Sequence, residues 1–553
     1  MTLSSPTDNP SEAEVDVEPI VSGEAVPTAA LGPTEVTPHH PLALDPSGNG
    51  FWNRIDRVTF GVTDRLNPIL VKEARESLKS SQFLITFFLL LAATLLWTGI
   101  GIVFNAPQVY YLPTGASLLA GYYFLMAVPI FGLVPLTAYR SLSSEIDNDT
   151  FELMSITGLG SFQIVRGKFL SAVLQMFLHF AAVVPSLAFT YLLRGVGLSD
   201  ICMVLLAVFM AGLFLTAFAL MIAPLLSGFL GQSFAMVGLV AAILVVQFIV
   251  AIMCLSGILG AGVGSDSVAW MLAGITAVIV LSFVVLFLKA AAAQIAPVTE
   301  NRSTSLRRWM LVQQFLWVAA IAGTSLFYDD FEPINFGSFV LAAYWLVMGS
   351  MFLSESTEIS PRVRRELPST FLGRVFLTAF TPGPSSGYLF ALCSGGVAIF
   401  ATGLFGTLMN QKVVQTECTV YSLAMIGYLT GYLGLVRLLS LPLACRGLFP
   451  LPAAVVVLGT VLMFSLLAPS VILVIATGNL PQNYSDLQLL NWAWTSMEGF
   501  SSGGLPAYLC GIAFLGGLIP TAINLLWMPD LYMYRKVAVP ARVRADRDSQ
   551  QNT

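Results

Sequence analysis

Four acidic side chains lie close together in one polar stretch of this 553-residue chain. Glu145, Asp147, Asp149 and Glu152 could bind a hard cation, because such ions prefer carboxylate oxygens. No histidine or cysteine lies near them in the stretch 139–168. Asp149 followed by Glu152 three residues later has the spacing of a helix capping box. We therefore expect helix caps and partner contacts from these acids, and no metal site.

Other patterns that could support catalysis are also weak. A phosphate-binding loop requires GxxxxGK followed by Ser or Thr, but Gly167-Lys168 is followed by Phe169. His179 stands alone in an apolar stretch, without the carboxylates that a proton relay needs, so we interpret it as a hydrogen-bonded packing residue. The six cysteines are scattered singly. These observations predict no catalytic residues, no cofactor and no enzymatic activity.

The composition shows what kind of scaffold holds these residues. Hydrophobic residues make up 56% of the chain and charged residues 10%, whereas soluble domains have about 25% charged residues. A helix needs about 20 apolar residues to cross a bilayer, and twelve stretches without Asp, Glu, Lys or Arg approach or exceed that length. We predict an all-α polytopic membrane protein with about twelve transmembrane helices. The stretches are 83–104, 116–138, 169–193, 201–226, 233–256, 268–288, 310–327, 336–353, 387–408, 419–436, 450–477 and 505–528.

The basic residues predict how the chain is oriented. Cytoplasmic loops retain Lys and Arg, and with a cytoplasmic N-terminus all but Arg194 and Lys412 fall in inner segments. Removing or adding one span would destroy this asymmetry. Both termini are therefore predicted to be cytoplasmic, in a multi-pass protein of the cell (inner) membrane.

The chain divides into five predicted parts. Residues 1–50 hold eight acids and no Lys or Arg, a composition typical of a disordered acidic tail. Residues 51–82 form a cytoplasmic interfacial helix region, and 531–553 a cytoplasmic C-terminal tail. The spans between them group into 83–290 and 291–530, which we interpret as two six-span halves because a large inner loop follows the second span of each. The lipid bilayer is the expected surrounding, and nothing indicates nucleic-acid binding.

A helix is predicted just before the first span. Asn67-Pro68 is a helix start, because proline at the first helical position loses no hydrogen bond. Such a helix either lies in the membrane interface or is an ordinary charged flank of the first span. Its apolar face consists of Ile69, Leu70, Ala74 and Leu78, and its other faces carry Lys72, Glu73 and Arg75.

The inner loop 139–168 is predicted to contain a short helix of its own. That helix runs from Thr150 to about Ile156 and is broken by Gly158 and Gly160. Ser161 is the expected cap of the helix that follows.

Three further features concern the second half. Ser360-Pro361 predicts another helix start, in a loop that is either a second docking site or a basic flank facing anionic lipid. Gly427 and Gly431 have the GxxxG spacing that permits close helix approach. The outer segment 478–504 is rich in Trp and Tyr and predicts an amphipathic or re-entrant helix.

Two stretches resemble the membrane subunits, or permeases, of type-2 ATP-binding-cassette (ABC) transporters, which are mainly exporters. They are 67–79, NPILVKEARESLK, and the loop from Glu145 through Ser161 followed by Gly167-Lys168. The resemblance covers roughly residues 65–290. It departs from the family at Asp149, where Gly is usual, at Phe151, where Leu is usual, and at Thr157-Gly158, which replaces Thr-Pro.

The resemblance implies a function for the loop. In such permeases this helix docks on a separate ATPase dimer, so it implies an ATPase-contact coupling helix with Glu145, Asp149, Thr150, Phe151, Glu152, Leu153 and Met154. The chain would move an unidentified substrate by ATP hydrolysis, and either one chain supplies both halves or it pairs with a second copy or second permease. Two alternatives remain open: an ion-coupled secondary transporter, which requires a carboxylate buried in a span, and a non-transporting scaffold that anchors an ATPase complex.

Overall fold

The computed structural model describes most of the membrane-spanning region, and the structural statements below concern only those residues. The predicted acidic tail, the residues before Pro68, the coupling helix (Asp149–Met154) and the C-terminal tail lie outside them. The described residues are 68–106, 114–148, 160–193, 195–225, 228–259, 266–297, 300–328, 330, 332–355, 360–366, 370, 373, 377–409, 415–445, 451–479, 483–499 and 505–526.

Twelve helices in the described part are long and apolar enough to cross a membrane, which confirms the predicted fold class. No strand occurs among the described residues. The helices follow the predicted stretches, and most are longer, mainly at ends predicted to be cytoplasmic, whereas α8, α17 and α19 are slightly shorter. They are α3 (Ser81–Phe104), α4 to α5 (Gly115–Asp147), α7 (Ser161–Leu192), α8 (Leu198–Ile222), α9 (Gly228–Leu259), α10 (Ser267–Ile295), α11 (Thr304–Tyr328), α12 (Glu332–Phe352), α15 (Pro384–Met409), α16 (Gln415–Cys445), α17 (Leu451–Thr477) and α19 (Ala507–Leu526).

The second spanning helix contains a π-helical turn. It consists of α4 (Gly115–Ala127), the turn η2 (Val128–Leu133) and α5 (Val134–Asp147). Pro135 has no N–H to donate one turn back, and the N–H of Val134 instead reaches the Pro129 carbonyl five residues earlier. Such turns frequently occur at functional sites, and this one lies on the helix that leads into the loop 139–168.

Hydrophobic side chains form three buried clusters in the described part. Two lie among the first six spanning helices, around Met126 and Leu220, and one lies mainly among the last six, around Trp345. Aromatic contacts join the first six spanning helices to the last six. The centre of the Phe283 ring on α10 lies 5.1 Å from that of the Trp317 ring on α11. The division of the spans into two six-span halves stays a prediction.

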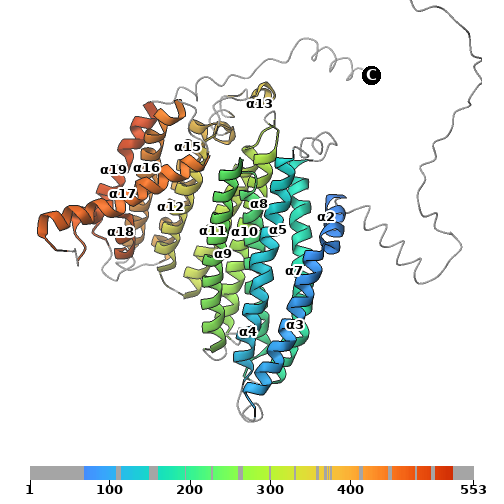
Figure 1. Cartoon of the computed structure of the whole chain (residues 1–553). Coiled ribbons are helices and arrows are strands. Elements are labelled where there is room, and N and C mark those ends of the chain that lie inside the picture. The colour runs from blue at the N-terminus through green and yellow to red at the C-terminus, as the bar shows by residue number, and fades with distance from the viewer. Residues whose placement is uncertain are drawn as a thin grey trace, which may run out of the picture. The chain divides into compact units, whose positions relative to one another are not determined.

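Helices α16 and α19 approach each other closely through glycine. A Cβ at Gly427 would lie 2.4 Å from the Ala513 carbonyl oxygen, and a Cβ at Gly431 would lie 3.2 Å from the Gly517 Cα atom. At Gly427 only glycine permits this approach, since a Cβ would overlap the backbone of α19, whereas at Gly431 a Cβ would make a tight contact that needs a small shift. The predicted role of Gly427 and Gly431 is confirmed. Figure 1 shows α16 and α19 side by side, with α17 crossing them obliquely.

Short helices occur where the sequence predicts them. Helix α2 (Pro68–Lys79) begins at the predicted proline, and α13 (Pro361–Glu366) begins at Pro361, with the Val363 N–H donating to the Ser360 hydroxyl. The segment 478–504 contains the turn η5 (Asp486–Leu490) and helix α18 (Trp492–Glu498), which contact α17.

One predicted helix cap was wrong by one residue. Gly160, in an extended conformation, is the N-cap of α7, and Ser161 is the first helical residue.

Candidate functional site

A buried lysine joins three helices at one end of the first six spans. Lys168 on α7 is 3% exposed. Its Nζ lies 3.0 Å from Glu73 Oε1 on α2 and 2.8 Å from Glu145 Oε1 on α5. The same Nζ donates to Ser141 Oγ at 2.7 Å. We call Lys168, Glu73, Glu145 and Ser141 the lysine cluster.

Local sequence explains why these side chains converge. Ser141 and Glu145 are four residues apart on α5, so they lie on one face of the helix. Helix α2 packs along α7, where Ser77 Oγ lies 3.4 Å from Ser171 Oγ, and this contact holds Glu73 opposite Lys168. Helix α7 begins directly after its N-cap Gly160, about two turns before Lys168. Helix α2 and the two helices on either side of residues 149–159 are thereby fastened at one point.

The buried Lys168 ammonium requires the partners that surround it in the lysine cluster. The carboxylates are mostly buried, with side chains 15% exposed for Glu73 and 18% for Glu145. Moving a lone ammonium into such a site is costly unless opposite charges and hydrogen bonds replace its water. Three donor contacts satisfy the three N–H groups of Lys168. The cluster thus fixes helix positions and adds little net stability relative to an apolar equivalent.

A polar cavity of about 390 Å³ adjoins the lysine cluster. It lies between α2, α5 and α7, and its wall includes Lys72, Glu76 and Gln175 as well as the cluster residues. Both charged and amide side chains line this space.

The structure brings only some of the predicted site residues together. Glu73 and Glu145, which are distant in sequence, meet at Lys168. Lys72 is exposed at the cavity wall, and Arg75 is exposed on α2. The remaining predicted coupling residues lie outside the described residues: Asp149, Thr150, Phe151, Glu152, Leu153 and Met154.

Asp147, the other acid considered for a metal site, also has a partner. Its Oδ2 accepts a hydrogen bond of 2.6 Å from Gln232 Nε2 on α9. No group of metal-binding side chains was found among the described residues.

A second buried cation lies in the second half. Arg307 on α11 is 0% exposed, and its Nη2 lies 2.7 Å from Glu355 Oε2, just beyond the end of α12. Its Nη1 donates to the carbonyls of Ala379 and Thr381 at 2.6 and 2.7 Å. Glu355 in turn accepts from the Gly383 N–H at 2.7 Å. We call this group the arginine cluster. It fastens α11 and the end of α12 to the segment before α15.

A third buried cation, Arg437, lies inside α16. Its Nη2 donates to Ser385 Oγ at 2.8 Å, and its guanidinium lies 4.9 Å from the centre of the Tyr388 ring. If each spanning helix crosses once, Lys168, Arg307 and Arg437 all lie at the same membrane side, since they are at the start of α7, the start of α11 and the end of α16.

The burial of Lys168, Arg307 and Arg437 was not predicted from the sequence. The predicted spans place the two arginines in inner loops, whereas the structure continues α11 and α16 through them. A signal was present in Glu145 and Glu355, the acids that follow the second and eighth predicted spans, because a carboxylate at the C-terminal end of a helix is unfavourable next to the helix dipole unless a cation compensates it.

His179 is buried as predicted. Its Nδ1 lies 2.8 Å from the Gln175 carbonyl oxygen, and its ring meets Phe83 edge-on at 5.4 Å. These contacts confirm the packing interpretation.

Comparisons with protein-family models, with curated proteins and with solved structures found no match to this chain. The site is therefore interpreted from its own geometry.

Proposed function

We propose that this multi-pass membrane protein is the permease of an ABC exporter of the cell inner membrane. A separate ATPase dimer would dock on the loop that follows Glu145 and supply the free energy of ATP hydrolysis. The substrate is unidentified, and the chain acts either alone with two halves or together with a second permease.

The lysine cluster is the observation that carries this proposal. The proposed docking loop, 149–159, starts directly after α5 and ends directly before α7. Lys168 connects both of these helices to α2. A push on the loop would therefore move α5, α7 and α2 as one body. The π-helical turn at Val128–Leu133 lies between this body and the start of α4, where it can absorb the displacement.

The charges of the described interior also favour an external energy source. The buried ionisable side chains there are Lys168, Arg307, Arg437 and His179, together with tyrosines and cysteines. An ion-coupled transporter uses a carboxylate within the spans, whereas Glu145 and Glu355 lie at or just beyond the ends of spanning helices and are already paired with Lys168 and Arg307. A mechanical input from a second protein fits this pattern better than an ion gradient.

Recovery of the complex tests the proposal. The affinity-tagged full chain is purified from its host in mild detergent, and the associated proteins are identified and assayed for ATP hydrolysis. We expect a nucleotide hydrolase to co-purify, and Glu152→Lys to reduce its recovery at least about tenfold, since a reversed charge in an interface costs more than 1.4 kcal/mol. Glu300→Lys is the matched control, because Glu300 is exposed in another loop of the same predicted side.

The remaining outcomes decide between the alternatives. If no hydrolase accompanies the chain under any mild condition, the exporter proposal is wrong. Coupling requires that the lysine cluster transmit movement between the hydrolase and the spans. If a hydrolase binds but its rate of ATP hydrolysis in vesicles is the same with the wild type and with Lys168→Met, the chain is a scaffold. Transport driven by an ion gradient in vesicles without the hydrolase would establish the secondary transporter.

A further inference from the structure

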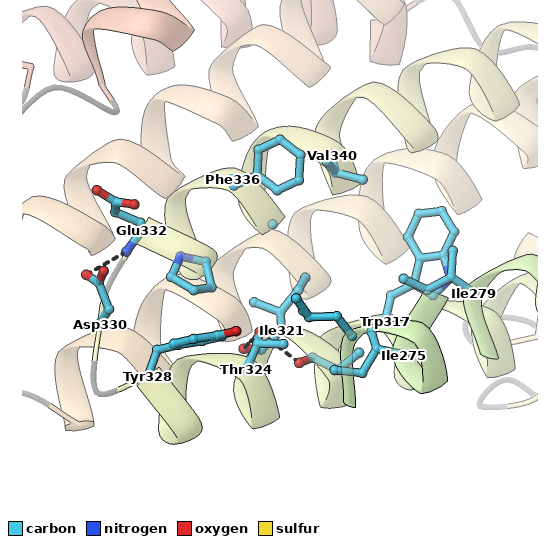
Figure 2. Close-up of a pocket in the computed structure, with 14 residues that line it drawn as sticks. Ile275, Ile279, Trp317, Ile321, Thr324, Tyr328, Asp330, Glu332, Phe336 and Val340 are labelled. Carbon is cyan, nitrogen blue, oxygen red and sulfur yellow. Dashed lines mark hydrogen bonds between the residues drawn. The ribbon is translucent and has the colours of Figure 1, made fainter. Parts of the chain in front are cut away.

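A large apolar groove lies between α10, α11 and α12. Its volume is about 700 Å³, within the range of sites that bind small molecules, about 300–1,000 Å³. Leu272 and Phe336 are exposed at its rim, so the groove is open toward the surroundings of the spanning helices. Figure 2 shows its wall of apolar side chains, with Trp317 and Ile279 at one end and Asp330 and Glu332 at the other.

The groove has the length of one membrane leaflet. Its wall on α11 runs from Trp317 to Tyr328, and eleven helical steps span about 16 Å. The hydrocarbon core of a bilayer is about 30 Å thick. The groove therefore starts near the middle of the membrane and ends where the helices leave it, at the segment 328–332.

The polar end of the groove is negatively charged. Asp330 and Glu332 both line it, and no Lys or Arg is among the described lining residues. Asp330 Oδ1 accepts the Glu332 N–H at 3.3 Å. Among the described residues no cation pairs with Asp330 or Glu332, so their remaining carboxylate oxygens can accept hydrogen bonds from a ligand. A carboxylate pair at this depth favours a cationic group with N–H donors.

We propose that this groove binds a membrane amphiphile with an acyl chain and a primary-ammonium headgroup. The acyl chain lies along Ile321, Ile275 and Trp317, and the ammonium donates to Asp330 and Glu332. Phosphatidylethanolamine is the common lipid with this chemistry. With the predicted orientation, the bound lipid belongs to the outer leaflet. The inference goes beyond the exporter proposal and requires no ATPase.

A second apolar cavity provides a control within the same chain. It has a volume of about 470 Å³ and lies between α8, α9 and α10. Among its described lining residues the one acid is Asp200, whose Oδ2 already accepts the Gly197 N–H at 2.9 Å as a helix cap. A lipid that is recognised by its ammonium should prefer the groove with two carboxylates over this cavity.

Native mass spectrometry of the full chain tests the proposal. Delipidated protein in detergent is titrated with phosphatidylethanolamine, phosphatidylcholine or phosphatidylglycerol of the same acyl chains. We expect one phosphatidylethanolamine to bind about tenfold more tightly than either other lipid, as the gain of a charge-assisted hydrogen bond implies. Asp330→Asn with Glu332→Gln should abolish the preference. Asp266→Asn should retain it, because Asp266 caps α10 outside the groove.

A steric variant covers the case in which the charge variants fold poorly. Ala320→Trp fills the groove and should prevent binding, whereas Ala207→Trp in the second cavity should not. Equal binding of the three lipids, or binding unaffected by Ala320→Trp, would overturn the proposal. A dimer that forms without lipid and is lost in Ala320→Trp would assign the groove to a second copy of the chain and would also overturn it. The exporter proposal stands or falls separately, on recovery of the hydrolase.

Discussion

Lys168 on α7 and Glu145 on α5 lie 2.8 Å apart, although 22 residues separate them and those residues include the whole proposed docking loop. The ion pair closes the base of the loop, so the two helices cannot separate there without exposing a buried charge. Glu73 brings α2 into the same contact.

Removing the lysine should destabilise the protein. Lys168→Met leaves Glu73 and Glu145 facing each other without a cation, and the loss of one member of a buried ion pair costs about 3 kcal/mol. Chemical or thermal unfolding in detergent measures the loss. The triple change Lys168→Met, Glu73→Gln, Glu145→Gln should return stability to within about 1 kcal/mol of the wild type. If Lys168→Met alone were as stable as the wild type, Lys168 would not be a buried partner of Glu73 and Glu145.

Replacing Arg307 of the arginine cluster with lysine should destabilise the protein. Arg307→Lys keeps the charge but loses the planar fork that reaches Glu355 and two backbone carbonyls at once. We expect a loss of about 1–3 kcal/mol from the buried acceptors left unpaired. Arg308→Lys is the matched control, since Arg308 is the next residue of α11 and is exposed. Equal stability of the two variants would show that the fork is unimportant.

Two adjacent glycines on α19 should differ sharply. A Cβ at Gly517 would lie 2.1 Å from the Gly427 carbonyl oxygen on α16, whereas a Cβ at Gly516 meets nothing within 4 Å. Gly517→Ala should therefore cost about 1–3 kcal/mol by overpacking. Gly516→Ala should be neutral or stabilise by up to about 1 kcal/mol, because alanine is the better helix former. The two free energies of unfolding, measured under one condition, provide the check, and a neutral Gly517→Ala would mean that α16 and α19 are not so close.

The predicted orientation can be measured with single cysteines. Glu300 and Asn479 are both exposed, and the distribution of basic residues places Glu300 inside and Asn479 outside. In intact cells a membrane-impermeant maleimide should label Asn479→Cys above the wild-type background and leave Glu300→Cys unlabelled until the membrane is opened. The reverse pattern would invert the topology and would place the loop 149–159 outside, where it could not meet a cytoplasmic ATPase.

The spans could be predicted because each needs a long apolar stretch, and their number and order in the described part follow from composition alone. The start of α2 at Pro68 and the close approach at Gly427 were also predictable, since they depend on local steric properties. The burial of Arg307 was not. A charge near the end of a span looks the same in sequence whether it faces lipid headgroups or packs inside the protein. Its partner Glu355 lies 48 residues away, and only tertiary packing brings the two together.

The burial of Lys168, Arg307 and Arg437 bears on how the chain acquires its topology during synthesis. All three belong to the excess of positive residues from which the cytoplasmic side is predicted, yet in the folded protein they are buried. The insertion machinery must therefore sense them while the nascent helices are still separate. Once the helices have assembled, these cations no longer contribute to orientation and instead link helices inside the protein.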